Sequence, residues 1–185
     1  MKRITLLLFT ISLSLFVSCS NDDNDDPTTI DQSLIPGVWK LTDITSEDGR
    51  FSTTLNGIPL TGNYEASGKD YTMEITFTET AAEEVNTFTS TGGFTAVGQV
   101  QIPTQDPIEL EQNFPDFFGT GQWRIDGNKL ITTVEGESQT YEIRELTSTT
   151  LKLAGSIDES VDYDLNGTNI TVNLTGTIIT TLSKS

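Results

Sequence analysis

The sequence predicts an all-β domain in which about eight to ten antiparallel strands form an up-and-down barrel, with the alternative that the barrel stays partly open. Three observations predict this fold. Apolar and polar residues alternate after Leu34, as in YTMEITF at 71–77. Asp-Gly and Asn-Gly pairs, which favour hairpin turns, separate the alternating runs. Helical periodicity is confined at most to one short turn at 79–85, ETAAEEV.

The strands follow from this alternation in chain order. YTMEITF has Tyr71, Met73, Ile75 and Phe77 on one face, and TYEIREL, TLKLAG and NITVNLTG alternate in the same way. We expect hairpin turns at EDG 47–49, NG 56–57, DGN 126–128, EGE 135–137 and NG 166–167. Residues 122–155 therefore read as a four-stranded meander. Periodicity alone leaves open whether the strands close into a barrel or split into a sandwich.

Both tryptophans of the chain occur in copies of one pentapeptide, GVWKL at 37–41 and GQWRI at 121–125. In each copy a glycine permits a bend or a close backbone approach. Trp39 and Trp123 would then face inward as structural core residues. The same holds for the aliphatic residue two positions later.

A Gly-x-Trp in the first strand resembles the corresponding element of lipocalin-type barrels. GVWKLTDI matches that element, and GQWRIDGNKLI with YEIRELTSTTLKL is similar to the second half of lipocalin-like domains in Bacteroidetes lipoproteins. The resemblance implies a barrel whose first tryptophan closes one end. Lipocalins carry an arginine near the chain end that stacks on this tryptophan, whereas here the last strand ends in Lys184.

The N-terminus predicts export and lipid attachment. A basic start, MKR, precedes an apolar run that is too short to span a bilayer, and a small residue precedes the only cysteine, Cys19. FVSC resembles a lipobox, which implies that residues 1–18 are a signal peptide and that Cys19 is lipidated. The other interpretation is an ordinary secretory signal with Cys19 as a free thiol.

The segment 19–33 is predicted to be a disordered acidic tether. Its aspartates resemble the export signal of surface lipoproteins, which implies a place on the outer membrane and display at the cell surface; they are Asp22, Asp23, Asp25 and Asp26. The other interpretation of this acidic run is a plain linker. Removing residues 1–18, with Lys2 and Arg3, changes the net charge from −17 to about −19. A chain this acidic is not expected to bind nucleic acid, which is recognised through its phosphates. The barrel domain is expected at 34–185.

Catalytic chemistry has few candidate residues. The chain has no histidine and one cysteine, which removes nucleophile–histidine pairs and the usual zinc sites. DYDLNG at 162–167 resembles the start of an EF-hand loop, but position twelve is Asn173 where calcium needs a glutamate. A hairpin turn at Asn166 is the simpler interpretation. We therefore expect no enzyme activity, no cofactor and no metal.

Two functions fit the sequence. The first is binding of a small apolar or amphipathic ligand inside the barrel. The loop expected at 103–121 would either cap one end of the barrel with its own phenylalanines, or act as a lid or an aromatic contact for a ligand or partner. The second is an interaction or structural module at the cell surface whose barrel is filled with side chains. Leu151 and Leu153 are also expected to face inward. The expected ligand-binding residues are Tyr71, Met73, Ile75, Phe77, Phe114, Phe117, Phe118, Tyr141 and Ile143.

Overall fold

The computed structural model describes residues 30–185, apart from 56, 81–84, 102–107, 116–117 and 166–167. A short 3-10 helix, η1 (Gln32–Leu34), precedes a sheet of 11 strands. Within the described residues no helix is long and apolar enough to cross a membrane. The strands are β1 (Gly37–Leu55), β2 (Ile58–Lys69), β3 (Glu74–Thr78), β4 (Thr87–Thr91), β5 (Phe94–Gln101), β6 (Ile108–Phe114), β7 (Thr120–Asp126), β8 (Lys129–Val134), β9 (Glu137–Leu146), β10 (Thr150–Leu165) and β11 (Thr168–Lys184).

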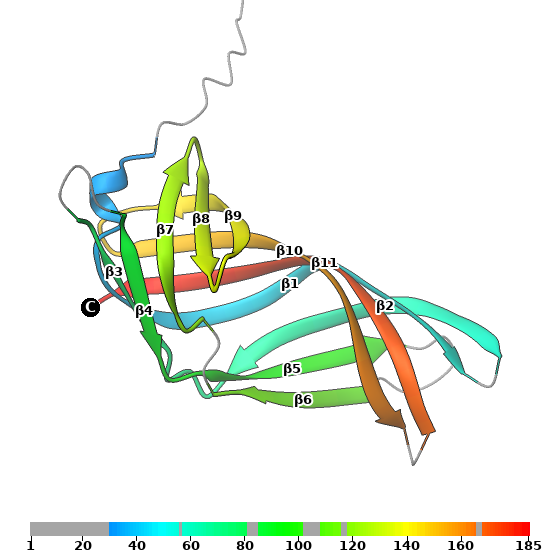
Figure 1. The fold of residues 1–185 in the computed structure, drawn as a ribbon. Helices are drawn as coiled ribbons and strands as arrows, with labels where there is room; N and C mark the ends of the chain where they lie inside the picture. The colour runs from blue at the N-terminus through cyan, green and yellow to red at the C-terminus, as the bar shows by residue number, and fades with distance from the viewer. Residues whose placement is uncertain (1–29, 56, 81–84, 102–107, 116–117, 166–167) are drawn as a thin grey trace, which may run out of the picture.

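Eight of the strands form a closed antiparallel barrel, which confirms the predicted fold. Around the barrel the order is β1, β3, β4, β7, β8, β9, β10 and β11, and β11 pairs again with β1 (Figure 1). The closing pair is long, with Trp39 opposite Lys184 at one end and Thr53 opposite Val172 at the other. The meander predicted at 122–155 corresponds to β7, β8, β9 and the start of β10.

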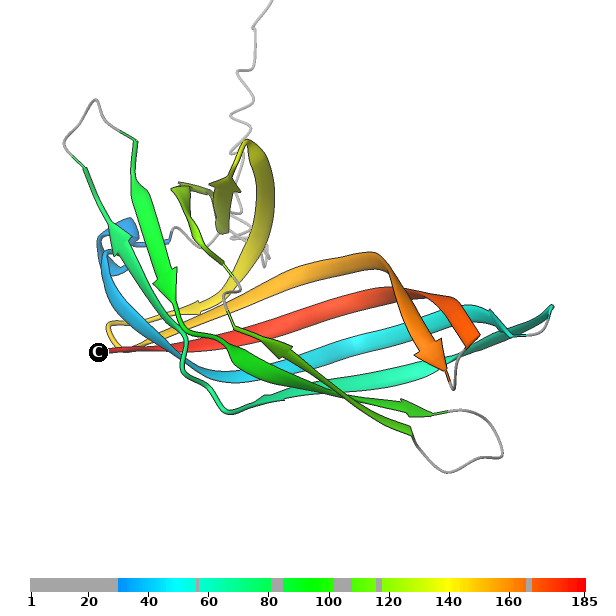
Figure 2. The same ribbon diagram turned by 60° about the horizontal axis from the view of Figure 1, so that its bottom comes forward.

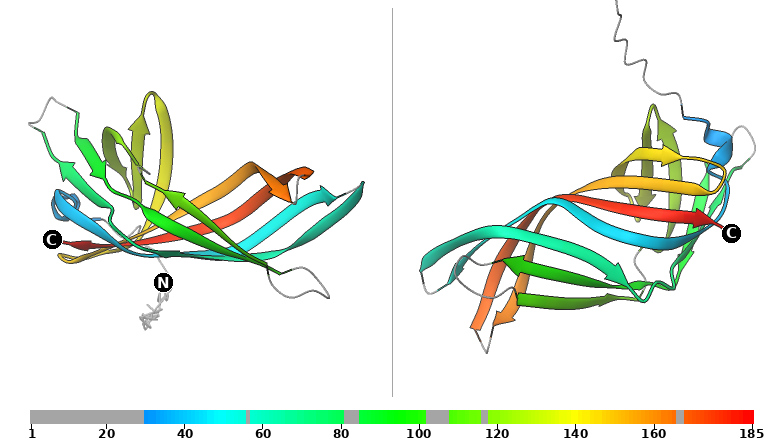
Figure 3. Two further views of the ribbon diagram at one scale, coloured as in Figure 1. Left: turned by 90° about the horizontal axis from the view of Figure 1, so that it is seen from below. Right: turned by 180° about the vertical axis from the view of Figure 1, so that it is seen from behind.

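The remaining strands build a second part of the sheet, which we call the extension. It consists of β2, β5 and β6 together with the distal parts of three barrel strands: 49–55 of β1, 155–165 of β10 and 168–176 of β11. Its strand order is β10, β11, β1, β2, β5 and β6. Figures 2 and 3 show a curved sheet that projects from the barrel and is open on one side.

The turn expected at 47–49 is wrong, because these residues lie inside β1. The pairing of β1 with β11 shifts between Glu47 and Arg50, and Asp48 has φ 54°. Asp-Gly therefore forms a β-bulge here, and a bulge uses the same left-handed backbone conformation as a hairpin turn. The bulge lies where β1 leaves the barrel and enters the extension.

Two of the other expected turns agree with the structure, and the remaining two lie partly or wholly outside the described residues. The turns at 126–128 and 135–137 connect β7 to β8 and β8 to β9. Gly57 has φ 79° between β1 and β2, although residue 56 lies outside the described part. Residues 166–167 also lie outside it, between paired Leu165 and Thr168. Residues 81–84, where part of a helical turn was expected, also lie outside the described part.

The segment 103–121 is not a single loop. Strand β6 lies within it and pairs with β5 from Ile108 opposite Val100 to Phe114 opposite Phe94. The prolines that predicted a loop, Pro103, Pro107 and Pro115, flank this strand without entering it. Proline removes a ladder hydrogen bond only where it stands, so the run between the prolines remains free to pair.

Candidate functional site

The interior of the barrel is filled with side chains. Four of the expected ligand-binding residues, Ile75, Phe77, Phe118 and Tyr141, meet around a void of about 10 Å³. A volume of this size holds about one water molecule. A drug-sized ligand needs a few hundred Å³, so the void that these residues line does not admit one.

The other expected ligand-binding residues have different surroundings. Met73 and Ile143 are buried in the core but do not line the void. Tyr71 is half-buried, and its hydroxyl accepts a hydrogen bond from the Ile44 amide at 3.1 Å. Phe114 belongs to the extension, where it stacks on Phe94 with ring centres 5.3 Å apart. Phe117 lies outside the described residues.

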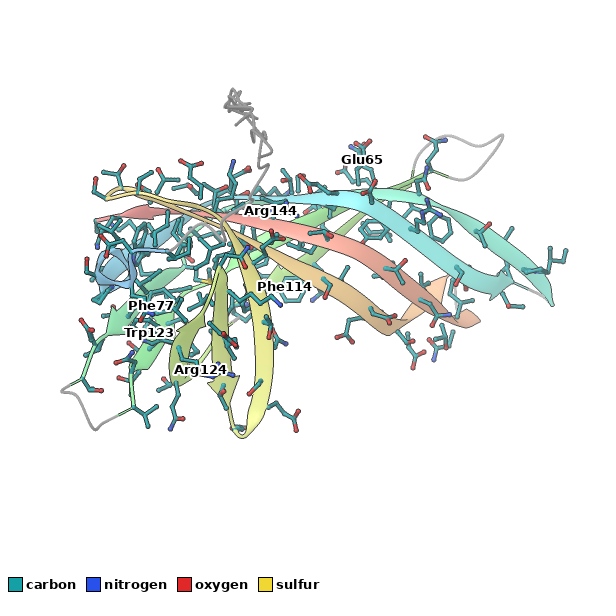
Figure 4. All side chains as sticks on the ribbon, turned by 90° about the horizontal axis from the view of Figure 1, so that it is seen from above. Glu65, Phe77, Phe114, Trp123, Arg124 and Arg144 are labelled. Carbon is teal, nitrogen blue, oxygen red and sulfur yellow. The ribbon has the colours of Figure 1, made fainter. Side chains whose placement is uncertain are left out.

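The two tryptophans belong to one core. The Trp39 indole is fully buried and donates a hydrogen bond to the Ile35 carbonyl at 2.8 Å. The Trp123 indole donates to the Thr87 carbonyl at 3.0 Å. Its ring lies edge-on to Phe77, with centres 5.7 Å apart (Figure 4). Each indole thus buries its apolar surface and satisfies its N–H group.

The glycines of both pentapeptides mark close approaches. At Gly37, where φ is 131°, an added Cβ would lie 2.7 Å from Cε of Lys184. Lys184 crosses this glycine, donates to the Leu34 carbonyl at 2.7 Å, and holds its ammonium 5.0 Å from the centre of the Trp39 ring. It occupies the place that the family resemblance assigns to arginine. At Gly121 an added Cβ would lie 2.3 Å from the Thr133 carbonyl oxygen.

A sequence profile decides the family. The profile of the lipocalin-like domain matches residues 35–153, which is more than half of the chain. The chain belongs to the lipocalin-like domain family. No curated protein and no solved structure matches it. The match ends within β10, so it covers β2, β5 and β6 but neither the distal part of β10 nor any of β11.

The lining of the lipocalin-like barrel continues onto one face of the extension, which we call the inner face. Strands β10 and β11 keep an unbroken register from Thr150 opposite Ser183 to Leu165 opposite Thr168. Alternate side chains of a strand share a face, so every second residue of β10 after buried Leu153 lies on the same side of the sheet as Leu153. Buried Phe51 of β1 lies opposite Gly62 and Leu174, and so it belongs to this face.

The inner face is apolar and almost uncharged. Its members include Leu60, Tyr64, Ala66 and Val100 on β2 and β5, and Ile157, Val161, Val172 and Leu174 on β10 and β11. Glu159 is its one charged residue among the side chains that the structure describes. The outer face, which includes Arg50 and Glu65, is polar, and Figure 4 shows Glu65 pointing away from the barrel side.

Two aromatic rings on the inner face lie on glycines of the neighbouring strand. An added Cβ at Gly62 would lie 2.5 Å from the Phe51 ring, and one at Gly49 would lie 3.0 Å from the Tyr64 ring. Both rings are therefore nearly buried without an opposing sheet. The Tyr64 hydroxyl is buried and has no hydrogen-bond partner among the described residues. This burial raises the pKa of Tyr64.

The described residues place no second layer over the inner face. Ile58 and Val161, at its distal rim, are 62% and 47% exposed. The alternation in NITVNLTG indicates that Val172 and Leu174 share one face of a strand, but it does not indicate what lies opposite that face. The unused signal was strand length, because β10 and β11, at 16 and 17 residues, are much longer than the usual five or six.

Two hollows on the surface differ in character from the inner face. One of about 430 Å³ lies on the outer face and is lined mainly by polar side chains, including Arg50, Asn63 and Asn173. The other, of about 480 Å³, lies between β9 and the segment that leads into β1, and includes Ile30 and Leu34. Both are shallow and open to solvent, in contrast with the filled barrel.

The described residues of the calcium-like stretch lie in β10 and β11, which pair as far as Leu165 opposite Thr168, whereas the expected turn at Asn166 lies outside the described part. Asp162 accepts a hydrogen bond from the Thr171 hydroxyl at 2.7 Å across the two strands. Asn166 and the side chain of Asp164 lie outside the described part. Elsewhere in that part, no group of three or more acidic or cysteine side chains could hold a metal ion.

Proposed function

We propose that this lipocalin-like protein is a non-enzymatic binding module that uses the inner face of its extension, with the packed barrel as a rigid base. The observation that carries the proposal is the continuation of the barrel lining onto an uncovered sheet face that is apolar except for Glu159. An apolar sheet face without a covering layer, with Ile58 and Val161 exposed at its rim, is typical of interaction sites. The second of the two functions predicted from the sequence, an interaction module with a packed barrel, is thus favoured.

We further propose that the module is held at the outer membrane by lipid on Cys19 and displayed at the cell surface. Both features lie in residues 1–29, outside the described part. The acidic residues Asp22–Asp26 support display. Replacing the four aspartates by alanine should protect the protein from protease added to intact cells, whereas the wild type should be removed. Equal removal would make the acidic run a spacer only.

Photolabelling tests the binding surface directly. The full-length protein, held in nanodiscs of neutral lipid, is irradiated with a small apolar diazirine, and labelled peptides are located by mass spectrometry. We expect labels on the segments that contain Ile58, Val161 and Leu174, because the probe partitions onto exposed apolar surface. A ligand inside the barrel would require Phe118 and Tyr141 to move apart, and would place the labels there instead.

A matched control separates the inner face from general exposure. Val85, between β3 and β4, is 55% exposed and lies outside the extension. Ile58→Asp with Val161→Asp should abolish labelling of the inner face, and Val85→Asp should leave it unchanged. Undiminished labelling of the extension in the double variant would contradict the proposal.

A further inference from the structure

We propose that the free edge of β10 in the extension binds an extended segment of another protein, apolar on one side and basic on the other. This inference rests on the proposed function, because the bound segment would lie at the border of the inner face. It adds a binding mode, strand addition, and the chemistry of the partner.

The edge is free along most of the distal part of β10. β9 pairs with β10 only from Leu151 to Ala154, whereas β11 pairs with it as far as Leu165. From Gly155 onward, among the described residues, β10 therefore has a partner on one side only. Half of the backbone N–H and C=O groups of such a strand point outward and remain available to another strand.

The side chains along this edge alternate between two kinds. Ile157 and Val161 lie on the inner face on either side of Glu159, whereas Asp158 and Asp162 lie on the outer face on either side of Ser160. A strand added beside β10 would place its own alternate residues next to these two rows. Apolar residues on its inner side and lysine or arginine on its outer side complement both rows.

Charge selects this partner over a second copy of the chain. From 155 to 165 the edge carries four acidic residues and no basic residue, in a chain of net charge −17. Two copies joined edge to edge would bring like charges directly opposite each other, which destabilises a sheet. The acids thus discourage self-association of an exposed edge while they attract a basic strand.

The other edge of the extension is a weaker candidate. β6 also has acids on its outer face, Glu109 and Glu111. Glu111, however, forms an ion pair with Lys69, which neutralises part of that charge. The β10 edge has no such internal cation among the ion pairs of the described residues, and so it offers the larger unpaired negative charge.

A synthetic peptide provides the probe. The peptide alternates lysine and valine over seven residues, and its affinity for the full-length protein in phosphatidylcholine nanodiscs is measured by biolayer interferometry at low and high salt. Two control peptides share its composition: one has the residues in blocks, and the other carries N-methyl groups along one edge. We expect only the unmodified alternating peptide to bind, and more weakly as salt increases.

Matched charge variants locate the site. Asp158→Lys with Asp162→Lys should weaken binding by about tenfold or more, since two attractive contacts become repulsive. Glu135→Lys with Glu137→Lys makes the same change in net charge at the exposed β8–β9 turn, and it should have an effect of less than about threefold. Asp158→Asn with Asp162→Asn, which keeps an acceptor for Thr171, should give an intermediate loss if the lysine variant fails to fold.

Three results would overturn this inference. They are equal weakening by the two lysine variants, equal binding of the N-methylated peptide, and a wild-type dimer that Val161→Asp dissociates. If the diazirine still labels the inner face, the failure concerns strand addition alone and the proposed function stands. Loss of both the labelling and the peptide binding would reject the function as well.

Discussion

The ammonium group of Lys184 lies 5.0 Å from the centre of the Trp39 ring, so the last residue of β11 covers the tryptophan of β1. The same ammonium donates to the Leu34 carbonyl just before β1 begins. One side chain therefore joins both ends of the domain at the point where the barrel closes. Gly37 permits this, since any larger residue would collide with the lysine chain.

Lys184→Met should lower the free energy of unfolding by about 1–2 kcal/mol, because it removes a cation–π contact and a hydrogen bond but keeps the apolar stem. Lys184→Arg retains charge and donors, and should stay close to the wild type. Urea unfolding of the two variants measures the difference. Equal loss in both would show that packing of the stem, not the charge, matters.

Trp123→Ala should cost about 3–5 kcal/mol, the range for truncating a large aromatic residue in a packed core. The indole contacts Phe77 and satisfies its N–H group on the Thr87 carbonyl. Denaturant unfolding monitored by circular dichroism gives the value without relying on tryptophan fluorescence. A variant as stable as the wild type would mean that the similarity of the second pentapeptide to the first is coincidental.

Gly62→Ala should destabilise the extension by about 1–3 kcal/mol, because the new methyl group would meet the Phe51 ring. Gly98→Ala is the matched control on the same face, since its methyl group would have no atom nearer than 3.9 Å. Hydrogen exchange of β1 and β2 amides reports the local effect. Similar exchange in the two variants would mean that the ring moves aside freely.

Stability should fall in strongly alkaline solution because of Tyr141. Burial raises the pKa of Tyr141 to about 12, although a hydrogen bond with Thr132 opposes the rise. The unfolded value is about 10, so between these values the folded chain binds more protons than the unfolded chain. The contribution is complete below about pH 10 and is lost as the pH rises to about 12, up to about 2–3 kcal/mol.

Comparison with Tyr141→Phe isolates this contribution, because other groups titrate alike in both proteins. Urea unfolding from about pH 9 to about pH 11.5 should show a steeper decline for the wild type. Parallel curves would mean that the Tyr141 phenol ionises as readily in the fold as in the unfolded chain.

Cys19→Ala should move the protein from the detergent phase to the aqueous phase when it is expressed in its host. The expectation rests on the small residue before the only cysteine of the chain. A single acyl chain binds membranes only marginally, so strong partitioning also reports the number of chains. If the wild type stays in the aqueous phase, Cys19 is not lipidated.

The sequence predicted the local parts of the fold better than the long-range ones. The β7–β10 meander follows from alternation and from Asp-Gly and Glu-Gly turns, which act between neighbours. At Asp48 the same local signal has another outcome, a bulge, because β11 continues to pair with β1 beyond it. The run that became β6 was hidden by its flanking prolines.

Alternation alone could not locate the candidate surface, for a related reason. Alternation shows that Val172 and Leu174 share a face, but it does not show which strand lies opposite them. From the C-terminal end of β11 back to Ile178, that face lines the barrel. From Gly176 toward the start of β11 it is uncovered, because there β1 pairs with β2 rather than with β3. The change of neighbour depends on contacts distant in sequence.

The shared strand β1 has a mechanical consequence. It continues from the barrel into the extension past the bulge at Asp48, and it pairs with β11 on both sides of that bulge. Tension applied between the start of β1 and a partner bound to the extension would act along these strands, across many hydrogen bonds loaded together in shear. The barrel and the extension should then resist pulling as one unit, because β1 and β11 pair on both sides of the bulge at their junction.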